Sequence, residues 1–348
     1  MKLKRVLAVV VMLALAASLL AGCGAESKAP AEGQAKDEQT GQTPAKTEEN
    51  QGTKPAEQSS GKKIIGVLIA DFSDQFQVYI MDGMKEAAKK YESENIEFVY
   101  QDAKYDANTQ MSQMENLISQ KASAIIVMPV DAKASVPMVQ QAVDANIPII
   151  SVNRKLENQE VAVSYCGSDS VESGEILMEQ MAKLLGGKGN IAVLEGQQGH
   201  EPQILRQQGI MNVLKKYPDI KIVADQSADW YRDKGMAVME NWLQSNLKID
   251  AVVAHNDEMA IGAMKAIADA GLTGKILVAG IDATPEALKF VKEGTLAYTV
   301  FQDAKGQGRA AIDTAVKVVK GEKVEKEIMI PYELVLKEKA DEYEARYK

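Results

Sequence analysis

The chain has 348 residues, with 40 Lys and Arg against 49 Asp and Glu, and a formal net charge of −9. This length suggests about two domains, and the 46% of hydrophobic residues can supply their cores. The acidic balance argues against a nucleic-acid partner, which needs a basic surface. Two cysteines and two histidines exclude a disulfide framework and leave little basis for a metal site or for a relay of catalytic histidines.

The first 22 residues have the pattern of a secretion signal. Three basic residues among the first five precede an uncharged apolar run over 6–20, which is too short for a typical membrane span. The run ends in the letters LAGC, with Cys23 last. This ending resembles the lipobox of bacterial lipoproteins, which implies removal of residues 1–22 and lipidation of Cys23. The alternative is an ordinary secretion signal with a chance cysteine. Lipidation would leave Cys166 as a lone thiol, which we expect to be buried.

The segment after Cys23 has the composition of a tether. Residues 24–61 contain no Val, Ile, Leu, Met, Phe, Tyr or Trp. Burial of this segment would gain no hydrophobic energy to offset the loss of backbone entropy. We therefore expect a disordered tether over 23–61 that joins a lipid anchor to the folded part. The protein would be extracytoplasmic and anchored to the cell membrane, on its outer face or on the periplasmic side.

From Lys62 onward, apolar runs typical of buried strands alternate with stripes typical of helices. The pattern predicts strands at 64–69, 96–100, 124–128, 148–152, 191–194, 220–223, 251–254, 276–279 and 296–301. It predicts helices at 77–91, 108–119, 135–145, 171–185, 206–217, 234–245, 258–270 and 285–292. Such alternation implies parallel sheets with helices on both faces, and two runs of it imply an α/β protein with two doubly wound lobes.

Ligands of doubly wound sheets bind beyond the carboxyl ends of the strands. The residues that follow the predicted strands are rich in carboxylates, amides and arginines, and they include the aromatics Phe76 and Trp230. Planar donors and acceptors together with aromatic faces suit a hydroxyl-rich ligand. The set contains no paired nucleophile and base. For any single residue, the alternative is a helix N-cap or a turn.

Three segments carry a family resemblance. The letters AHNDEMAIGA at 254–263, GIDATP at 280–285 and ANIPIISVNR at 145–154 are similar to the family patterns QNDEMALGA, GFDGTP and ANIPVITLDR. With them, 62–340 resembles the ribose-type periplasmic sugar-binding protein family, the substrate-binding subunits of carbohydrate ABC importers. The resemblance implies a type I periplasmic binding protein fold, with two lobes joined by a three-crossing hinge. It places the N-terminal lobe at 62–167 plus 303–331 and the C-terminal lobe at 168–302 plus 332–348.

The resemblance also implies the ligand site. In such proteins the lobes close on a sugar in the cleft and then dock on the membrane permease. The corresponding residues in this chain are Asp74, Phe76, Gln77, Asn153, Arg154, Arg206, Trp230, Asn256, Asp282 and Gln302.

Three of these residues depart from the ribose-binding pattern. Asn153 stands where ribose binders have Asp, Asp74 where they have Asn, and Gln77 where they have a second Phe. Gln77 would exchange stacking on ring C–H groups for a hydrogen bond. We therefore expect a hexose or a cyclitol such as inositol, with ribose and other pentoses left open.

Other motifs have simpler explanations. The pattern G-x-G-x-x-A at 306–311 imitates a dinucleotide site, but its spacing from the preceding strand is wrong, so we expect glycines for close helix packing. His200 is expected to be a loop residue or a ligand contact, and His255 a packing residue near the hinge or a solvated residue.

The expected protein is a monomeric solute-binding protein and not an enzyme, with no cofactor and no metal. Its partners would be a monosaccharide or cyclitol, the ABC permease, and the membrane through the lipid. An alternative is a sensor that presents its closed form to a membrane receptor kinase. A repressor-type regulator shares the two-lobe core but would need an N-terminal helix-turn-helix.

Overall fold

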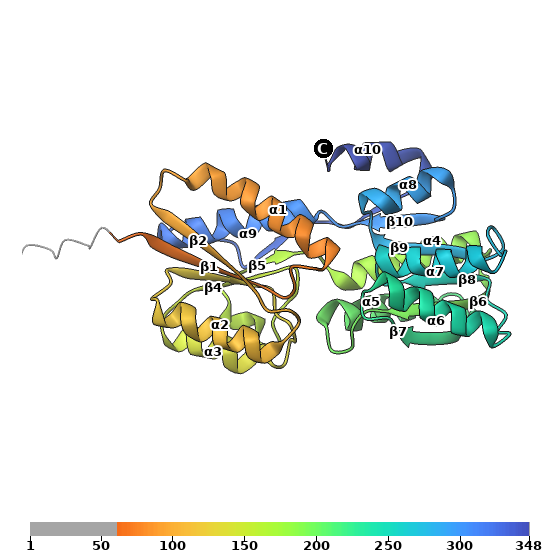
Figure 1. Cartoon of the computed structure of the whole chain (residues 1–348), viewed down its shortest axis with the longest axis horizontal. Coiled ribbons are helices and arrows are strands. Elements are labelled where there is room, and N and C mark those ends of the chain that lie inside the picture. Colours follow the sequence, from red (N-terminus) through yellow and green to blue (C-terminus); the bar gives the residue numbers. More distant parts are fainter. Residues whose placement is uncertain (1–60, 348) are drawn as a thin grey trace, which may run out of the picture. The chain divides into compact units, whose positions relative to one another are not determined.

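The computed structural model describes residues 61–347. The predicted signal peptide, Cys23 and the predicted tether up to residue 60 lie outside these residues. No helix within 61–347 combines the length and the apolar character needed to cross a membrane. Two six-stranded sheets organise this part of the chain (Figure 1).

The N-terminal lobe is built on a parallel sheet with strand order β11-β5-β4-β3-β1-β2. Its strands are β1 (Lys63–Ile69), β2 (Ile96–Asp102), β3 (Ala124–Val127), β4 (Ile149–Val152), β5 (Ser164–Gly167) and β11 (Glu327–Met329). One face is covered by α1 (Gln75–Ala88) and α9 (Ala304–Val319), and the other by α2 (Ala107–Ser119) and α3 (Ser135–Asp144). Each face has its own hydrophobic cluster, as expected for a sheet buried on both sides.

The C-terminal lobe repeats this plan with strand order β12-β10-β9-β8-β6-β7. Its strands are β6 (Lys188–Glu195), β7 (Asp219–Ser227), β8 (Ala251–Ala254), β9 (Leu277–Asp282), β10 (Tyr298–Phe301) and β12 (Glu333–Val335). On one face lie α4 (Ser170–Leu184) and α5 (Glu201–Leu214); the other carries α6 (Arg232–Gln244), α7 (Asp257–Asp269), α8 (Pro285–Glu293) and α10 (Ala340–Ala345). The edge strand β12 runs antiparallel to β10, whereas the sequence predicted parallel pairing throughout.

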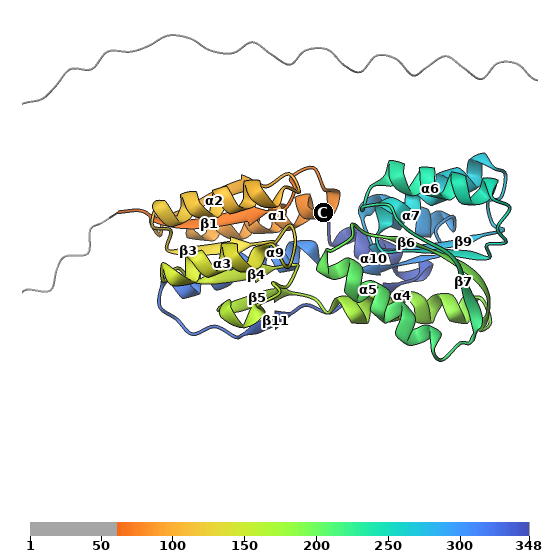
Figure 2. The same cartoon turned by 90° about the horizontal axis from the view of Figure 1, so that it is seen from below.

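The chain passes from one sheet to the other three times: after β5, after β10, and between β11 and β12 (Figure 2). The return helix α9 packs closely on α1, because both helices carry glycine at the contact. A Cβ on Gly308 would lie 2.1 Å from the carbonyl oxygen of Ile80, and one on Gly83 would lie 2.2 Å from that of Lys305. Gly308 therefore serves close helix packing, as the sequence predicted for the glycines at 306–311.

The two doubly wound lobes are confirmed, but some element limits differ from the prediction. Helix α5 begins at Glu201, five residues before the predicted start at residue 206. Its first turn has no apolar stripe, since Ile204 is 53% exposed, so periodicity could not detect it. The short strands β5, β11 and β12 were not predicted either, and β11 alternates between exposed and half-buried residues.

Candidate functional site

All ten residues that the sequence predicted as ligand-binding line one cavity in the cleft, and Pro202 is the eleventh lining residue. Five come from loops and the α1 start of the N-terminal lobe, and the others belong to the C-terminal lobe or, for Gln302, to a crossing segment. The strands of both sheets point their carboxyl ends at this cavity, which is where doubly wound sheets hold ligands. The geometry brings the residues together; their roles toward a ligand stay predictions.

Three of the lining residues have unusual backbone conformations. Asn153, Trp230 and Asp282 have φ angles of 63°, 74° and 127°, a region that residues with a Cβ rarely adopt. Asn153 and Trp230 come after strands, and Asp282 is the last residue of β9 (Leu277–Asp282). Strained backbone of this kind costs on the order of 1–3 kcal/mol per residue and gathers at functional sites.

The N-terminal wall of the cavity is held by a hydrogen-bond hub at Tyr105. Its hydroxyl donates to Oδ2 of Asp74 at 2.6 Å and accepts from Nε2 of Gln77 at 2.6 Å. Oδ1 of Asp74 caps α1 by accepting from the backbone of Phe76 and Gln77 at 2.9 and 3.1 Å, and Oε1 of Gln77 accepts from the backbone of Asp71 at 2.9 Å. Gln77 therefore keeps one N–H for a ligand, and its main bonds position Tyr105 and the preceding loop.

Arg154 completes this wall and is almost fully buried. Its Nη1 donates to the carbonyl of Pro129 and its Nη2 to the Tyr105 hydroxyl, both at 3.2 Å. Its Nε is buried without a hydrogen-bond partner among residues 61–347. The neighbouring Asn153 donates to Oε1 of Gln307 at 3.0 Å, which ties the site to α9.

Arg206 is the corresponding cation of the C-terminal wall. Its guanidinium donates to the carbonyl of His255, to Oε1 of Gln302 at 2.9 Å and to the hydroxyl of Tyr332 at 3.3 Å. Its centre lies 5.7 Å from the ring of Trp230, within cation–π range. Like that of Arg154, its Nε is buried and unpartnered.

Trp230 is fixed on three sides. Its indole Nε1 donates to Nδ1 of His200 at 2.9 Å, and its carbonyl accepts from Nδ2 of Asn256 at 3.1 Å. A Cβ on Gly196 would lie 2.0 Å from the indole ring, so only glycine fits beneath it. Asn256 also caps α7, because its Oδ1 accepts from the backbone of Met259 at 3.0 Å.

Burial sets the charges of the site. It raises the pKa of Asp282 well above its usual value, against the opposing effect of Arg206. Burial, followed by the charge of Arg154, lowers the pKa of His200 to about 2. Burial and Arg206 lower the pKa of His255 to about 3. Both histidines are therefore neutral, and the fixed positive charges are the two guanidinium groups.

Sequence reasoning did not identify the role of Tyr105 and left His200 undecided. Tyr105 lies three residues after the end of β2, which extends to Asp102, beyond the predicted end at residue 100. An isolated aromatic at a strand end was the available signal. His200 is the N-cap residue of α5 and is 2% exposed, and the late predicted start of that helix concealed its position. His255 is fully buried, as expected of a packing residue, and so is Cys166.

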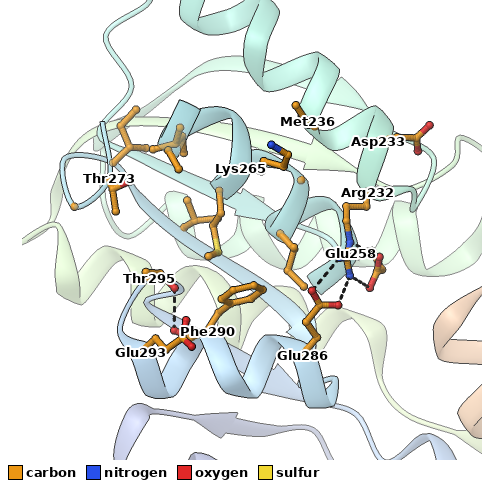
Figure 3. Close-up of a pocket in the computed structure, with 18 of the residues that line it drawn as sticks. Arg232, Asp233, Met236, Glu258, Lys265, Thr273, Glu286, Phe290, Glu293 and Thr295 are labelled. Atoms are coloured by element: carbon orange, nitrogen blue, oxygen red, sulfur yellow. Dashed lines mark hydrogen bonds and ion pairs between the residues drawn. The ribbon is translucent and has the colours of Figure 1, made fainter. Parts of the chain in front are cut away.

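A larger cavity of about 830 Å³ lies among α6, α7 and α8 (Figure 3). None of the ten predicted residues lines it. Its walls include apolar side chains such as Met264 and Phe290. Its most prominent cation, Arg232, is held by Glu258 at 2.9 Å and by Glu286 at 2.7 Å, so its positive charge already has two acidic partners.

Comparison with known proteins gives a consistent assignment. A family model, the periplasmic binding protein domain, matches residues 65–323. The chain is 39% identical over 288 residues to a putative rhizopine-binding protein of Rhizobium meliloti (81% of this chain, 93% of that one), and 34% identical over 293 residues to the ribose import binding protein of Bacillus subtilis (84% and 93%). An ABC transporter solute-binding protein from Bacillus halodurans, solved with bound myo-inositol, superposes with a TM-score of 0.80 at 47% identity and covers 83% of this chain and 99% of its own. The chain belongs to the periplasmic binding protein domain family, a family of binding proteins.

Proposed function

We propose that this protein is an extracytoplasmic solute-binding protein that captures a monosaccharide or cyclitol in its cleft and delivers it to an ABC permease. The observation that carries the proposal is the pair Arg154 and Arg206, one from each lobe, in a single cavity. Each has a buried Nε–H that has no partner within the described part of the chain. An unsatisfied buried donor costs about 1–3 kcal/mol, and a ligand hydroxyl that accepts from it would remove that cost.

The chemistry of the other lining groups supports the same ligand class. Asp282 offers carboxylate oxygens, Asn256 and Gln302 are amides, and Trp230 presents a large apolar face. Such a ring of polar groups can pair with several hydroxyls of one small molecule while the aromatic contacts its C–H groups. A phosphorylated or strongly anionic ligand is less suitable, because each arginine already has protein acceptors.

We propose a cyclitol related to myo-inositol as the first ligand to test. The replacement of an aromatic wall by Gln77 favours a hexose-sized ring over ribose. The myo-inositol-bound protein of Bacillus halodurans shares 47% identity with this chain, and the relatives compared include import-binding proteins. This favours delivery to a transporter over presentation to a receptor kinase.

Hinge closure would produce the loaded form. We propose lobes at 62–167 plus 303–331 and at 168–302 plus 332–348, which rotate about the three crossings and bury the ligand. The closed form would be what the permease recognises. No chemical step is required, and within residues 61–347 no group of three or more His, Cys, Asp or Glu side chains could hold a metal ion.

We further propose that the chain is a lipoprotein, cleaved after residue 22, anchored through Cys23 and acting as a monomer. Mass spectrometry of the mature N-terminus tests this: a diacylglyceryl group on Cys23 supports the anchor, and an unmodified N-terminus contradicts it.

The ligand is tested by calorimetry on residues 24–348, which include every described residue. The panel is myo-inositol, glucose, galactose, xylose and ribose at pH 7.5. We expect the tightest binding for myo-inositol or a hexose. Tight ribose binding with no response to the larger rings would contradict the ligand assignment, and no response to any of them would contradict the proposed function.

A further inference from the structure

Three rings from both lobes meet beside the cavity. The imidazole of His200, at the start of α5, lies between Tyr105 of the N-terminal lobe and Trp230 of the C-terminal lobe, with centroid distances of 5.3 and 6.2 Å. His200 is buried in this arrangement. Because Tyr105 is the partner from the opposite lobe, opening of the cleft removes its ring from His200, whereas Trp230 moves with His200.

The hydrogen bond to His200 fixes its protonation state. Nε1 of Trp230 donates to Nδ1 of His200 at 2.9 Å. An indole N–H can only donate, so Nδ1 must offer a lone pair. An imidazolium carries N–H on both ring nitrogens, and its Nδ1–H would face the indole N–H. This bond, which lies within the C-terminal lobe, therefore requires a neutral imidazole with its proton on Nε2. Closure favours that form further, because it brings the ring of Tyr105 onto the imidazole and the positive charge of Arg154 near it.

The charges around His200 act in the same direction. The guanidinium of Arg154 lies 5.4 Å from the centre of the Tyr105 ring, and its positive charge disfavours a protonated His200. The guanidinium of Arg206 lies over Trp230 and acts on His255.

The nearby carboxylates have other partners. Glu201 accepts from the hydroxyl of Ser170 at 3.2 Å, Asp131 accepts from the backbone of Ala134 at 2.7 Å, and Asp74 accepts from Tyr105. Asp131 also lies beside Gly199, the residue before His200. Burial and Arg154 are the causes that lower the pKa of His200.

We propose that His200 is a positioning residue for ligand capture, which must lose its proton before the lobes close, so that acidity opposes closure and weakens binding. This inference rests on the proposed function. Trp230 would be held in its ligand-facing position by the neutral imidazole, and Tyr105 would cover that imidazole from the other lobe.

The direction of the pH effect on the apparent Kd follows from the linkage between protonation of His200 and closure of the lobes. An exposed histidine has a pKa of about 6.5, and the closed form lowers it, so closure releases a proton at acidic pH. Binding is unaffected well above the pKa of the open form. Below it, the apparent Kd rises by about tenfold for each pH unit.

The test is calorimetry with myo-inositol, or with whichever panel sugar binds most tightly, at pH 7.5, 6.5 and 5.5. The variant is His200→Gln, because a glutamine Oε1 can accept from the indole without titrating. We expect the Kd of the wild-type protein to rise by about tenfold between pH 7.5 and 5.5, of which about fivefold falls between pH 6.5 and 5.5, and that of His200→Gln to rise by less than about threefold over the whole range.

The number of protons released on ligand binding distinguishes the titration of His200 from that of other groups. Titrations at pH 6.0 in two buffers with different ionisation enthalpies count the protons exchanged on binding. Burial also raises the pKa values of Glu201, to about 7, and of Asp282. Both remain in the variant, so the wild-type protein should release more protons than His200→Gln, by up to one per ligand.

Tyr105→Phe is the matched control. It keeps an aromatic ring against His200 but loses the hydroxyl hub, so affinity should fall while the pH slope remains. The chain has two histidines, which also permits an NMR titration of the wild-type protein if a variant fails to fold: one imidazole should titrate in the free protein and stop titrating with ligand bound.

Three outcomes would overturn the inference: a wild-type Kd that is constant from pH 7.5 to 5.5, a His200→Gln variant that keeps the wild-type slope, or an NMR signal that titrates equally in both states. Failure of every panel sugar to bind at pH 7.5 would instead overturn the proposed function, and this inference with it.

Discussion

The cleft cavity and the larger cavity among α6, α7 and α8 differ in whether their buried polar groups have free hydrogen-bonding capacity. In the cleft, Arg154 and Arg206 are buried and each keeps an unpartnered Nε–H. In the larger cavity among α6, α7 and α8, Arg232 is 38% exposed on its side chain and is held by two carboxylates. This difference indicates that a site for a polar ligand is better recognised by buried donors without a partner than by the volume of the cavity.

The largest expected effect that would test this contrast comes from Arg206→Ala. Truncating one partner of a buried charged network costs about 2–5 kcal/mol, roughly 30- to 5,000-fold in affinity. Calorimetry with the tightest panel sugar measures it.

The control for Arg206→Ala is Lys265→Ala, which deletes a cation that lines the larger cavity and pairs with Asp269 at 3.0 Å. It should leave the affinity unchanged within about twofold, since exposed pairs contribute little. Comparable losses in both variants would break the contrast between the cavities.

The second-largest expected effect distinguishes the roles of two buried carboxyl groups, those of Asp282 and Asp257. Asp282→Asn should weaken sugar binding by about tenfold, as expected for the loss of one charge-assisted hydrogen bond. The same change should raise the Tm of the ligand-free protein. The pKa of Asp282 is raised in the folded state, so its ionised form destabilises the fold above the ordinary carboxyl pKa of about 3.9. The gain should vanish below that pH, where the carboxyl is protonated in both states.

Asp257→Asn is the matched control for the expected loss of affinity and gain in Tm of Asp282→Asn. Burial also raises the pKa of Asp257, to about 7, but its carboxylate accepts from the Thr299 hydroxyl at 2.7 Å and from the backbone of Thr284 at 2.9 Å. An asparagine has one acceptor oxygen and would lose one of these bonds. Its Tm should not rise, and an increase equal to that of Asp282→Asn would show that burial alone explains both.

The smallest effect is expected from Arg232→Ala in the larger cavity. The variant should lower the free energy of unfolding by about 1 kcal/mol, because its ion pairs are partly exposed and screened by solvent. High salt should reduce this difference. Thermal unfolding at low and high salt measures it, and a loss of sugar binding beyond about threefold would show that the cavities are coupled.

Much of the fold was predictable because its core strands are continuous apolar runs. The pattern of β1, β3 and β8 is visible in sequence, since their residues are buried on both faces of a sheet. The edge strands β11 and β12 were not, because three-residue strands with mixed exposure carry no period. Their pairing is imposed by tertiary contacts, which override local pattern.

The candidate site was likewise predictable only in part. The ten residues could be placed because motifs with fixed spacing position them after strands. The network among them could not be predicted, because it depends on side chains from distant loops. Tyr105 receives hydrogen bonds from Gln77 and Arg154, and Arg206 reaches Tyr332, so these partners become neighbours only after the lobes have formed.

The three passages between sheets have a consequence for the order of synthesis. Strand β11, which pairs with β5, follows it by some 160 residues, and β12 completes the other sheet at residues 333–335. Neither sheet can be finished until almost the whole chain is available. A nascent or partly exported chain would therefore present two unfinished sheet edges at once, and assembly of both lobes would wait for the same last few residues.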